Sequence, residues 1–226
     1  MNAKKTKTMV ITRSSPTPKL KITIDGEEVK QVESFTYLGQ LITEDGKNDN
    51  EIMHRISIAR SVFNKMRTTL TSRRLSINIR KRILKCYVWS TLLYGCETWT
   101  LSDNIIKRLN AFEMWTYRRM LRISWTDKIT NESVLQTINN PLQITNIIKK
   151  KKLQYFGHLM RHNNISRTLL DGHINGKRSR GRPRAMWSHN IIEWTGKNYE
   201  NAVRTAKDRK KWKSIISSNP VQQDGT

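Results

Sequence analysis

The hydrophobic period of the chain changes near residue 50, and this change limits the folds it can adopt. Residues 1–45 alternate apolar and polar side chains, which is typical of strands with one buried face. Asp25-Gly26 and Asp45-Gly46 supply turn signals between these runs. From Asn50 onward, apolar residues recur with the period of a helix. The sequence therefore predicts an α+β chain, in which a small antiparallel hairpin sheet precedes a helical bundle and a mostly helical, basic C-terminal region.

Three successive helices are expected in the bundle. The first has an apolar face composed of Ile52, Ile56, Ala59, Phe63, Met66 and Leu70. The second begins at a Ser76 cap and stops at Gly95, and the third begins near Ser102.

The region after Pro141 has a different composition and a different set of elements. A helix is expected over 144–162, followed by a hairpin or loop over 166–184. Pro183 fits the first position of the next helix, and a last helix covers 199–217. We divide the chain into residues 1–48, 49–140 and 141–218, with a disordered tail at 219–226.

The charge of the chain points to a polyanionic partner. Lys and Arg number 42 against 18 Asp and Glu, which gives a formal net charge of +24. Nucleic acid is the first partner to consider, because a polyanion relieves this self-repulsion. A membrane is disfavoured, because the sequence has no run of about 18 apolar residues and no secretory signal at its start.

The two cysteines, Cys86 and Cys96, are interpreted as buried thiols in a reducing intracellular compartment. Ten residues apart on one helix, their α-carbons would be separated by roughly 15 Å, which is too far for a disulfide.

A series of strings in a consistent order resembles the C-terminal third of the reverse transcriptases of LINE-type (non-LTR) retrotransposons. The strings are NAKKTKTMVI, VESFTYLGQLIT, EIMHRISIARSVFNKM, STLLYGCETWTL, RLNAFEMWTYRRMLRISWTDKITNESVL, LQYFGHLMRH and GKRSRGRPR. Together they span nearly the whole chain, and their collinear order is more specific than any one of them.

The resemblance implies a polymerase-derived organisation. Residues 1–48 would be the end of a palm, 49–140 a thumb-like bundle and 141–218 a basic nucleic-acid-binding region. Lys5 and Lys7 would lie near the phosphates of the incoming nucleotide. The primer-grip hairpin, which holds the 3′ end of the growing strand, would comprise Phe35, Tyr37, Leu38 and Gly39. The protein would act in the nucleus.

The sequence departs from this family in its acidic residues. Two-metal phosphoryl transfer needs carboxylates that hold two Mg²⁺ ions close together, and no Asp-Asp pair occurs in these 226 residues. We therefore expect a fragment that cannot polymerise alone and holds no cofactor. The intact parent would use Mg²⁺, and upstream polymerase and endonuclease segments would be its partners.

Two basic segments are candidates for nucleic-acid contact. The first resembles the core of an AT-hook and comprises Lys177, Arg178, Arg180, Gly181, Arg182, Pro183 and Arg184. Its alternative is a solvated loop, although general phosphate contact is favoured by the total charge. The second comprises Lys149, Lys150, Lys151 and Lys152, with Tyr155 and Phe156 as a stacking surface. These lysines are equally consistent with the solvated side of a core helix.

For the other candidate residues, a structural role is favoured over a functional one. His158 and His162 are four residues apart and could ligate zinc, but the cysteines lie at the wrong spacing, so no metal site is expected. The aromatic residues assigned to packing are Tyr87, Trp89, Tyr94, Trp99, Trp115 and Trp125 in the bundle, and Trp187, Trp194 and Trp212 in the C-terminal region. No phosphate loop or hydrolase triad stands out.

The leading functional hypothesis is a fragment of an RNA-directed DNA polymerase that binds template–primer or target DNA. The alternatives are a stand-alone basic DNA-binding or chromatin protein that uses the AT-hook-like loop, and an inert translation product. The choice among DNA, RNA and RNA–DNA hybrid stays open.

Overall fold

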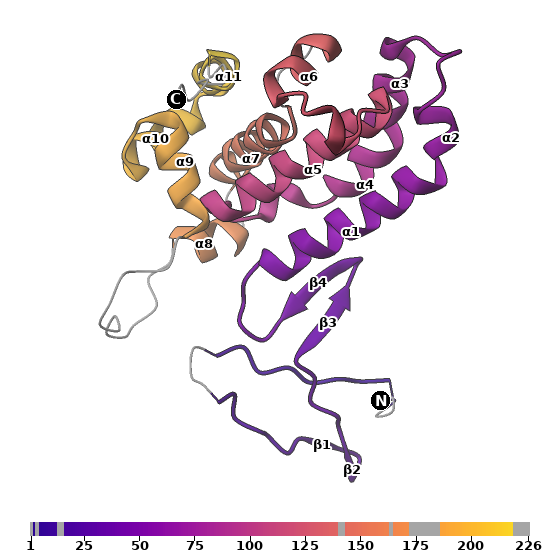
Figure 1. Cartoon of the computed structure of the whole chain (residues 1–226). Coiled ribbons are helices and arrows are strands. Elements are labelled where there is room, and N and C mark those ends of the chain that lie inside the picture. Colours follow the sequence, from indigo (N-terminus) through magenta and orange to yellow (C-terminus); the bar gives the residue numbers. More distant parts are fainter. Residues whose placement is uncertain are drawn as a thin grey trace.

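The computed structural model describes residues 2, 5–12, 16–139, 143–162, 165–171 and 186–218. It confirms the α+β class: two small antiparallel hairpins lie at one end of a body of packed helices (Figure 1).

The strands are fewer and shorter than the alternating pattern suggested. β1 (Thr23–Ile24) pairs with β2 (Glu27–Glu28) across the predicted Asp25-Gly26 turn, and β3 (Ser34–Tyr37) pairs with β4 (Gln40–Thr43). The alternating segment near the N-terminus contributes one isolated bridge, between Thr8 and Gln31.

The helices of the first part of the chain form a bundle. Their bounds are α1 Asp49–Lys65, α2 Arg67–Leu70, α3 Ile77–Ile83, the wide π-type turn η1 Leu84–Trp89, α4 Ser90–Leu92, the 3₁₀ turn η2 Cys96–Thr98, α5 Asp103–Leu121, the 3₁₀ turn η3 Trp125–Asp127 and α6 Asn131–Ile138. The expected second helix is thus the continuous run α3–η1–α4. Its predicted cap is confirmed, because the Ser76 hydroxyl accepts from the amide of Ile79. Ser102 caps α5 in the same way, and Gly95 takes a left-handed conformation after α4, with φ +67°.

Among the described residues from 143 to 218, the helices are α7 Ile144–Arg161, α8 Ile165–Asp171, α9 Trp187–Thr195, α10 Tyr199–Lys207 and α11 Arg209–Ser218. α8 corrects the expectation of a hairpin or loop from residue 166. The start of α9 corrects another, because Met186 is extended and the helix begins at Trp187, four residues beyond Pro183. Pro183 itself and Pro141 lie outside the described residues.

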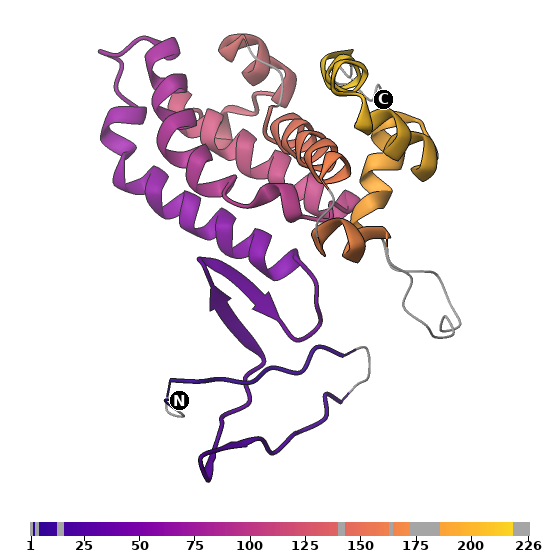
Figure 2. The same ribbon diagram turned by 180° about the vertical axis from the view of Figure 1, so that it is seen from behind.

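α7 is shared by two hydrophobic cores. Its first half packs Ile144 and Ile148 against the bundle, whose largest buried side chains include Trp89 and Phe112. Its second half packs against α9, α10 and α11 through Leu153, Phe156, Leu159, Met160, Ile191, Ala202, Ala206 and Trp212. Figure 2 shows α7 lying between the bundle and the C-terminal helices.

The N-terminus of α7 is capped by a carboxylate from another helix. Glu113 of α5 is fully buried, and its two oxygens accept from the backbone amides of Gln143, at 2.8 Å, and Ile144, at 2.9 Å. The Tyr117 hydroxyl donates to the same carboxylate at 2.7 Å. Burial raises the pKa of Glu113, and these hydrogen bonds oppose the rise. The carboxylate thus supplies the cap that the Gln143 side chain does not.

Replacing Glu113 with Gln tests this cap. The amide nitrogen cannot accept a hydrogen bond, so one buried donor loses its partner, and we expect the free energy of unfolding to fall by about 2 kcal/mol. The exposed Glu193→Gln in α9 is the control, with an expected change within about 0.5 kcal/mol. Urea unfolding followed by circular dichroism measures both. Equal effects in the two variants would contradict the capping role.

Candidate nucleic-acid interface

The turn between β3 and β4 places an apolar side chain in solvent on a constrained backbone. Leu38 and Gly39 have φ values of +48° and +78°. Glycine adopts this region freely, whereas leucine does so at a cost, and such conformations cluster at binding and catalytic sites. Leu38 is 74% exposed, so burial of its own side chain does not offset that cost. Other contacts must hold the turn.

Two donors hold the carbonyls of this turn. The Arg55 guanidinium of α1 donates to the Gly39 carbonyl, and the Tyr94 hydroxyl donates to the Leu38 carbonyl at 3.1 Å. Arg55 also lies over the Tyr94 ring, 4.6 Å from its centroid. The turn is therefore fixed to the bundle from two separate elements.

Arg55 is itself fixed by a buried ion pair. Its Nε donates to Glu51 Oε1 at 2.7 Å, and Glu51 Oε2 accepts from the Leu41 amide of β4 at 2.7 Å. Both side chains are buried. The Gln40 side chain lies against Gly95, where a β-carbon would collide with it. We call this set, Gln40, Glu51, Arg55, Tyr94 and Gly95, the hairpin clamp.

The structure brings the four primer-grip candidates together at this hairpin. Phe35 and Tyr37 are two residues apart on β3 and therefore lie on one face, opposite Ile42 and Gln40 of β4. Phe35 and Tyr37 are 43% and 59% exposed. The hairpin thus presents apolar and aromatic side chains to solvent, with Leu38 at its tip. Sequence reasoning missed the clamp, which links residues 10 to 56 positions apart.

The four lysines of α7 do not form one basic ridge. Successive helical residues are rotated by about 100°, so a run of four points around most of the helix. Lys149 lies near the Trp194 ring, Lys150 is exposed towards α11, and Lys151 is exposed towards Leu93 and Glu97. Lys152 has no exposed surface, so the prediction of a phosphate contact is corrected at that residue.

Lys152 instead joins three segments inside the protein. Its Nζ donates to the Trp99 carbonyl at 2.7 Å and to Asn190 Oδ1 at 2.8 Å. The Nζ atom also lies 4.8 Å from the ring centroid of Trp187 and 5.6 Å from that of Trp194. Burial lowers the pKa of Lys152 to about 7.

Asn190 extends this junction through backbone hydrogen bonds. Its side chain accepts from the Leu101 amide and donates to the Leu101 carbonyl, both at 2.9 Å. The Trp187 indole donates to the Glu97 carbonyl at 2.9 Å. The sequence gives no signal for these pairs, which lie about 90 positions apart.

The other candidate residues lie in three further parts of the chain. Lys5 and Lys7 are exposed in the N-terminal segment. The AT-hook-like residues Lys177 to Arg184 lie outside the described residues. His158 and His162 have ring centroids 4.4 Å apart, and the described residues include no group of three or more His, Cys, Asp or Glu that could hold a metal.

Some assignments to the core are wrong. Cys96 is buried, and desolvation raises the pKa of its thiol to about 12, but Cys86 is exposed. Trp89, Trp99 and Trp212 are buried, and Trp115, Trp187 and Trp194 are partly buried, as expected. Tyr87, Tyr94 and Trp125 are 56%, 51% and 89% exposed. The wide turn η1 changes the helical period, which explains why a regular 3.6-residue pattern misplaces Cys86 and Tyr87.

Comparisons with known proteins bear on the origin of the chain. An uncharacterized transposon-derived protein of Caenorhabditis elegans is 28% identical over 210 residues, which cover 85% of this chain and 73% of the relative. No protein-family model and no solved structure matches. The similarity supports a transposable-element origin for the chain. Across the described residues, no helix has the length and apolar character needed to cross a membrane.

Replacing Arg55 with Met tests the hairpin clamp. The change leaves the Glu51 carboxylate buried without its cation and releases the Gly39 carbonyl, so we expect a loss of about 3 kcal/mol in unfolding free energy. Arg60→Met, on the exposed side of the same helix, should cost less than about 1 kcal/mol. Chemical denaturation measures both. A further change of Glu51 to Gln should recover part of the loss, and no recovery would argue against the pair.

The pH dependence of stability tests the burial of Lys152. Its folded pKa lies below the unfolded value, so the unfolded state binds the extra proton between about pH 7 and pH 10. Wild-type stability should therefore rise with pH across this window, relative to Lys152→Met, by on the order of 1 kcal/mol per pH unit. A neutral amine retains two N–H groups for Trp99 and Asn190. Denaturant titrations at pH 7 and pH 9 measure the difference in unfolding free energy between wild type and Lys152→Met, in which the contributions of the other titratable groups cancel. A difference that is the same at the two pH values would refute the lowered pKa of Lys152.

Proposed function

We propose that this chain is part of an RNA-directed DNA polymerase of a non-LTR retrotransposon and that it binds template–primer or target DNA. The transposon-derived relative supports an element of this general kind. The collinear strings that resemble the reverse transcriptases support the narrower assignment. With no Asp-Asp pair in the sequence, the chain supplies binding, and Mg²⁺-dependent chemistry belongs to other segments of the parent. The site of action would be the nucleus.

The hairpin clamp is the observation that carries this proposal. A binding surface for the end of a nucleic-acid strand needs apolar or aromatic groups that stack on a base or sugar and that keep a fixed position. Tyr37 and Leu38 are exposed, and the turn between them and β4 is held by hydrogen bonds from Arg55 and Tyr94. A buried ion pair fixes Arg55 in turn. The strained backbone at Leu38 is thus retained by an exposed and a part-buried hydrogen bond, the second of them supported by a buried ion pair, which fits a binding role.

The charge of the chain supports phosphate contact over the rest of the surface. A net charge of +24 favours association with any nucleic acid and makes the affinity depend on salt. The stand-alone chromatin alternative depends on Lys177 to Arg184, outside the described residues, and no described contact favours it. Phosphate contacts made by charge alone do not distinguish a strand end from a continuous duplex. Stacking at the hairpin tip would favour the strand end.

Tyr37→Ala tests the proposal on a labelled DNA primer annealed to an RNA template with a recessed 3′ end. Loss of one stacking side chain should weaken binding about tenfold, since base–aromatic stacking is worth about 1–3 kcal/mol. A blunt hybrid of the same length should bind the variant as well as it binds wild type. Tyr87→Ala removes an equally exposed tyrosine from η1 and is the matched control. Fluorescence anisotropy measures the affinities.

Three results would contradict the proposal: no binding by the wild type, an equal loss on the two substrates, or an equal loss in the two variants.

A further inference from the structure

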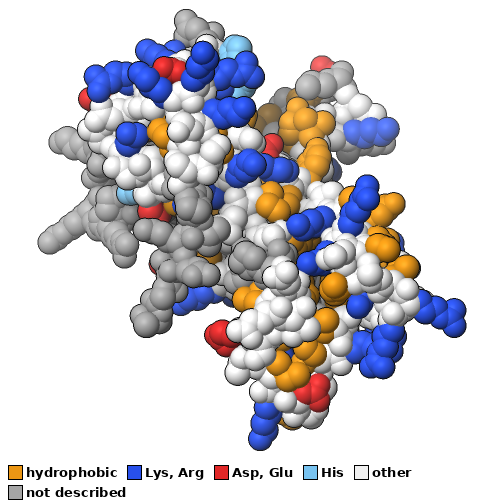
Figure 3. Space-filling view, turned by 90° about the horizontal axis from the view of Figure 1, so that it is seen from above, with side chains coloured by type: hydrophobic (Ala, Val, Ile, Leu, Met, Phe, Trp, Pro, Cys, Tyr) orange, Lys and Arg blue, Asp and Glu red, His pale blue; other side chains and the backbone are white. Residues whose placement is uncertain are grey.

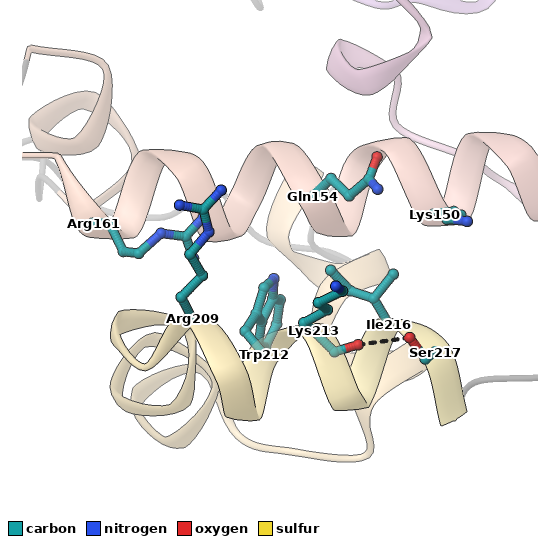
Figure 4. A pocket seen from close by; sticks show the side chains of 8 residues that line it. All are labelled: Lys150, Gln154, Arg161, Arg209, Trp212, Lys213, Ile216 and Ser217. Carbon is teal, nitrogen blue, oxygen red and sulfur yellow. Dashed lines mark hydrogen bonds between the residues drawn. The ribbon is translucent and has the colours of Figure 1, made fainter.

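A cleft of about 360 Å³ lies between α7 and α11, away from the hairpin clamp and outside both predicted basic segments except at Lys150. Figure 4 shows the side chains that line it: Lys150, Gln154, Arg161, Arg209, Trp212, Lys213, Ile216 and Ser217. Four of these eight side chains are cationic, and no acidic side chain belongs to the lining in the described part of the chain.

The lining residues lie on two facing helical stripes. Lys150, Gln154 and Arg161 recur at spacings of four and seven along α7, and Arg209, Lys213 and Ile216 at four and three along α11. Between them, Gly157 lets the Trp212 indole pack against the α7 backbone, where a β-carbon would collide with it. The Trp212 indole also donates to the Leu153 carbonyl at 2.8 Å. The cleft is therefore held at a defined width by a buried contact.

The cations of the cleft are oriented but not neutralised. Arg161 donates to the Ala206 carbonyl at 2.9 Å, which fixes its guanidinium at one end, and Arg209 lies beside it in Figure 4. Within the described part of the chain, no hydrogen-bond or ion-pair partner is found for the side chains of Lys150, Arg209 and Lys213. Lys and Arg side chains also gather over the C-terminal helices in Figure 3. Like charges that converge without an anion repel one another, and a bound anion removes that cost.

The shape of the cleft favours an extended anion over a single phosphate ion. Lys150 and Arg161 are eleven residues apart, so they are separated by roughly 16 Å along the helix. Measured along the axis of a duplex, each strand carries one phosphate every 3.4 Å or so. The cations at the two ends are thus spaced to contact several phosphates of a single strand. Gln154 and Ser217 add neutral polar groups between them.

We propose that the α7–α11 cleft binds the phosphodiester backbone of one nucleic-acid strand, at a site separate from the hairpin tip. This inference rests on the nucleic-acid binding of the proposed function and assigns it a second contact. The contacts are to phosphates, so the cleft accepts any base sequence.

A triple variant tests the cleft: Lys150→Ala, Arg209→Ala and Lys213→Ala. Arg161 is kept because it caps α10. The matched control is Lys207→Ala, Lys210→Ala and Lys211→Ala, which removes the same charge from exposed positions outside the cleft on the same helical unit. The probe is a labelled thymidine 30-mer, titrated by fluorescence anisotropy at several salt concentrations.

The cleft triple should flatten the slope of log affinity against log salt by about 2 units, since each lost single-strand phosphate contact contributes about 0.7. The control triple should change it by less than 1 unit. Equal changes in the two triples, or no change in either, would overturn the proposed cleft. Thermal unfolding should show that both triples remain folded, because the substituted side chains are exposed.

A single substitution gives a second test that leaves the cations in place. Gln154→Glu puts one negative charge inside the cleft, whereas Ser214→Glu puts it on the outer face of α11. The first should weaken binding of the 30-mer several-fold more than the second, and equal effects would count against the cleft.

The two proposals fail in distinguishable ways. If the wild type binds neither the 30-mer nor the primer–template, the hairpin proposal and the cleft proposal are both wrong. If the cleft variants match their controls while Tyr37→Ala still loses its preference for the recessed end, only the cleft assignment is wrong.

Discussion

The buried amine of Lys152, with its hydrogen bonds, is the interaction on which the arrangement of the two cores depends. α7 belongs to both cores, and Lys152 lies where the first core gives way to the second. Its hydrogen bonds reach the segment ahead of α5 through Trp99 and reach α9 through Asn190. Asn190 in turn satisfies both backbone groups of Leu101. These polar groups are buried, so each would lose a necessary partner if α9 moved away. The junction is therefore specific as well as stabilising.

The same logic explains how so basic a chain folds. With 42 Lys and Arg against 18 acids, most cations cannot pair with a carboxylate, and several donate to backbone carbonyls instead. Arg80 donates to Met120 near the end of α5, and Lys81 donates to Ile138 at the end of α6. The carbonyls at a helix C-terminus lack intrahelical partners and carry partial negative charge, which a cation complements. These cations serve the fold, so the net charge overstates what is available to a nucleic acid.

The parts of the structure that could be predicted from the sequence are those set by local contacts. The Ser76 and Ser102 caps and the turn at Asp25-Gly26 each involve residues within three positions of one another. The Glu113 cap and the Asn190 junction could not be predicted, because an acid or an amide within a helix looks the same whether it faces solvent or a distant backbone group. The lysine run shows a third kind of limit. Composition correctly marks it as basic, but only the packing of α7 against two cores decides which of the four lysines is buried and which neighbours the others face.

The hairpin tip and the α7–α11 cleft differ in the physical basis of the contacts that they offer. The tip is apolar, and its position is set by the first core through α1 and Tyr94. The cleft is cationic, and its width is set by the second core through Gly157 and Trp212. Under the two proposals, stacking at the tip would be short-range and largely independent of salt, whereas phosphate contacts in the cleft would weaken as salt rises. A strand that occupied both sites would be held in position by the hairpin tip and attracted electrostatically by the cleft. The two contacts are carried by cores that meet at the Lys152 junction, so the same buried amine that joins the two cores would also influence the spacing of the two contacts.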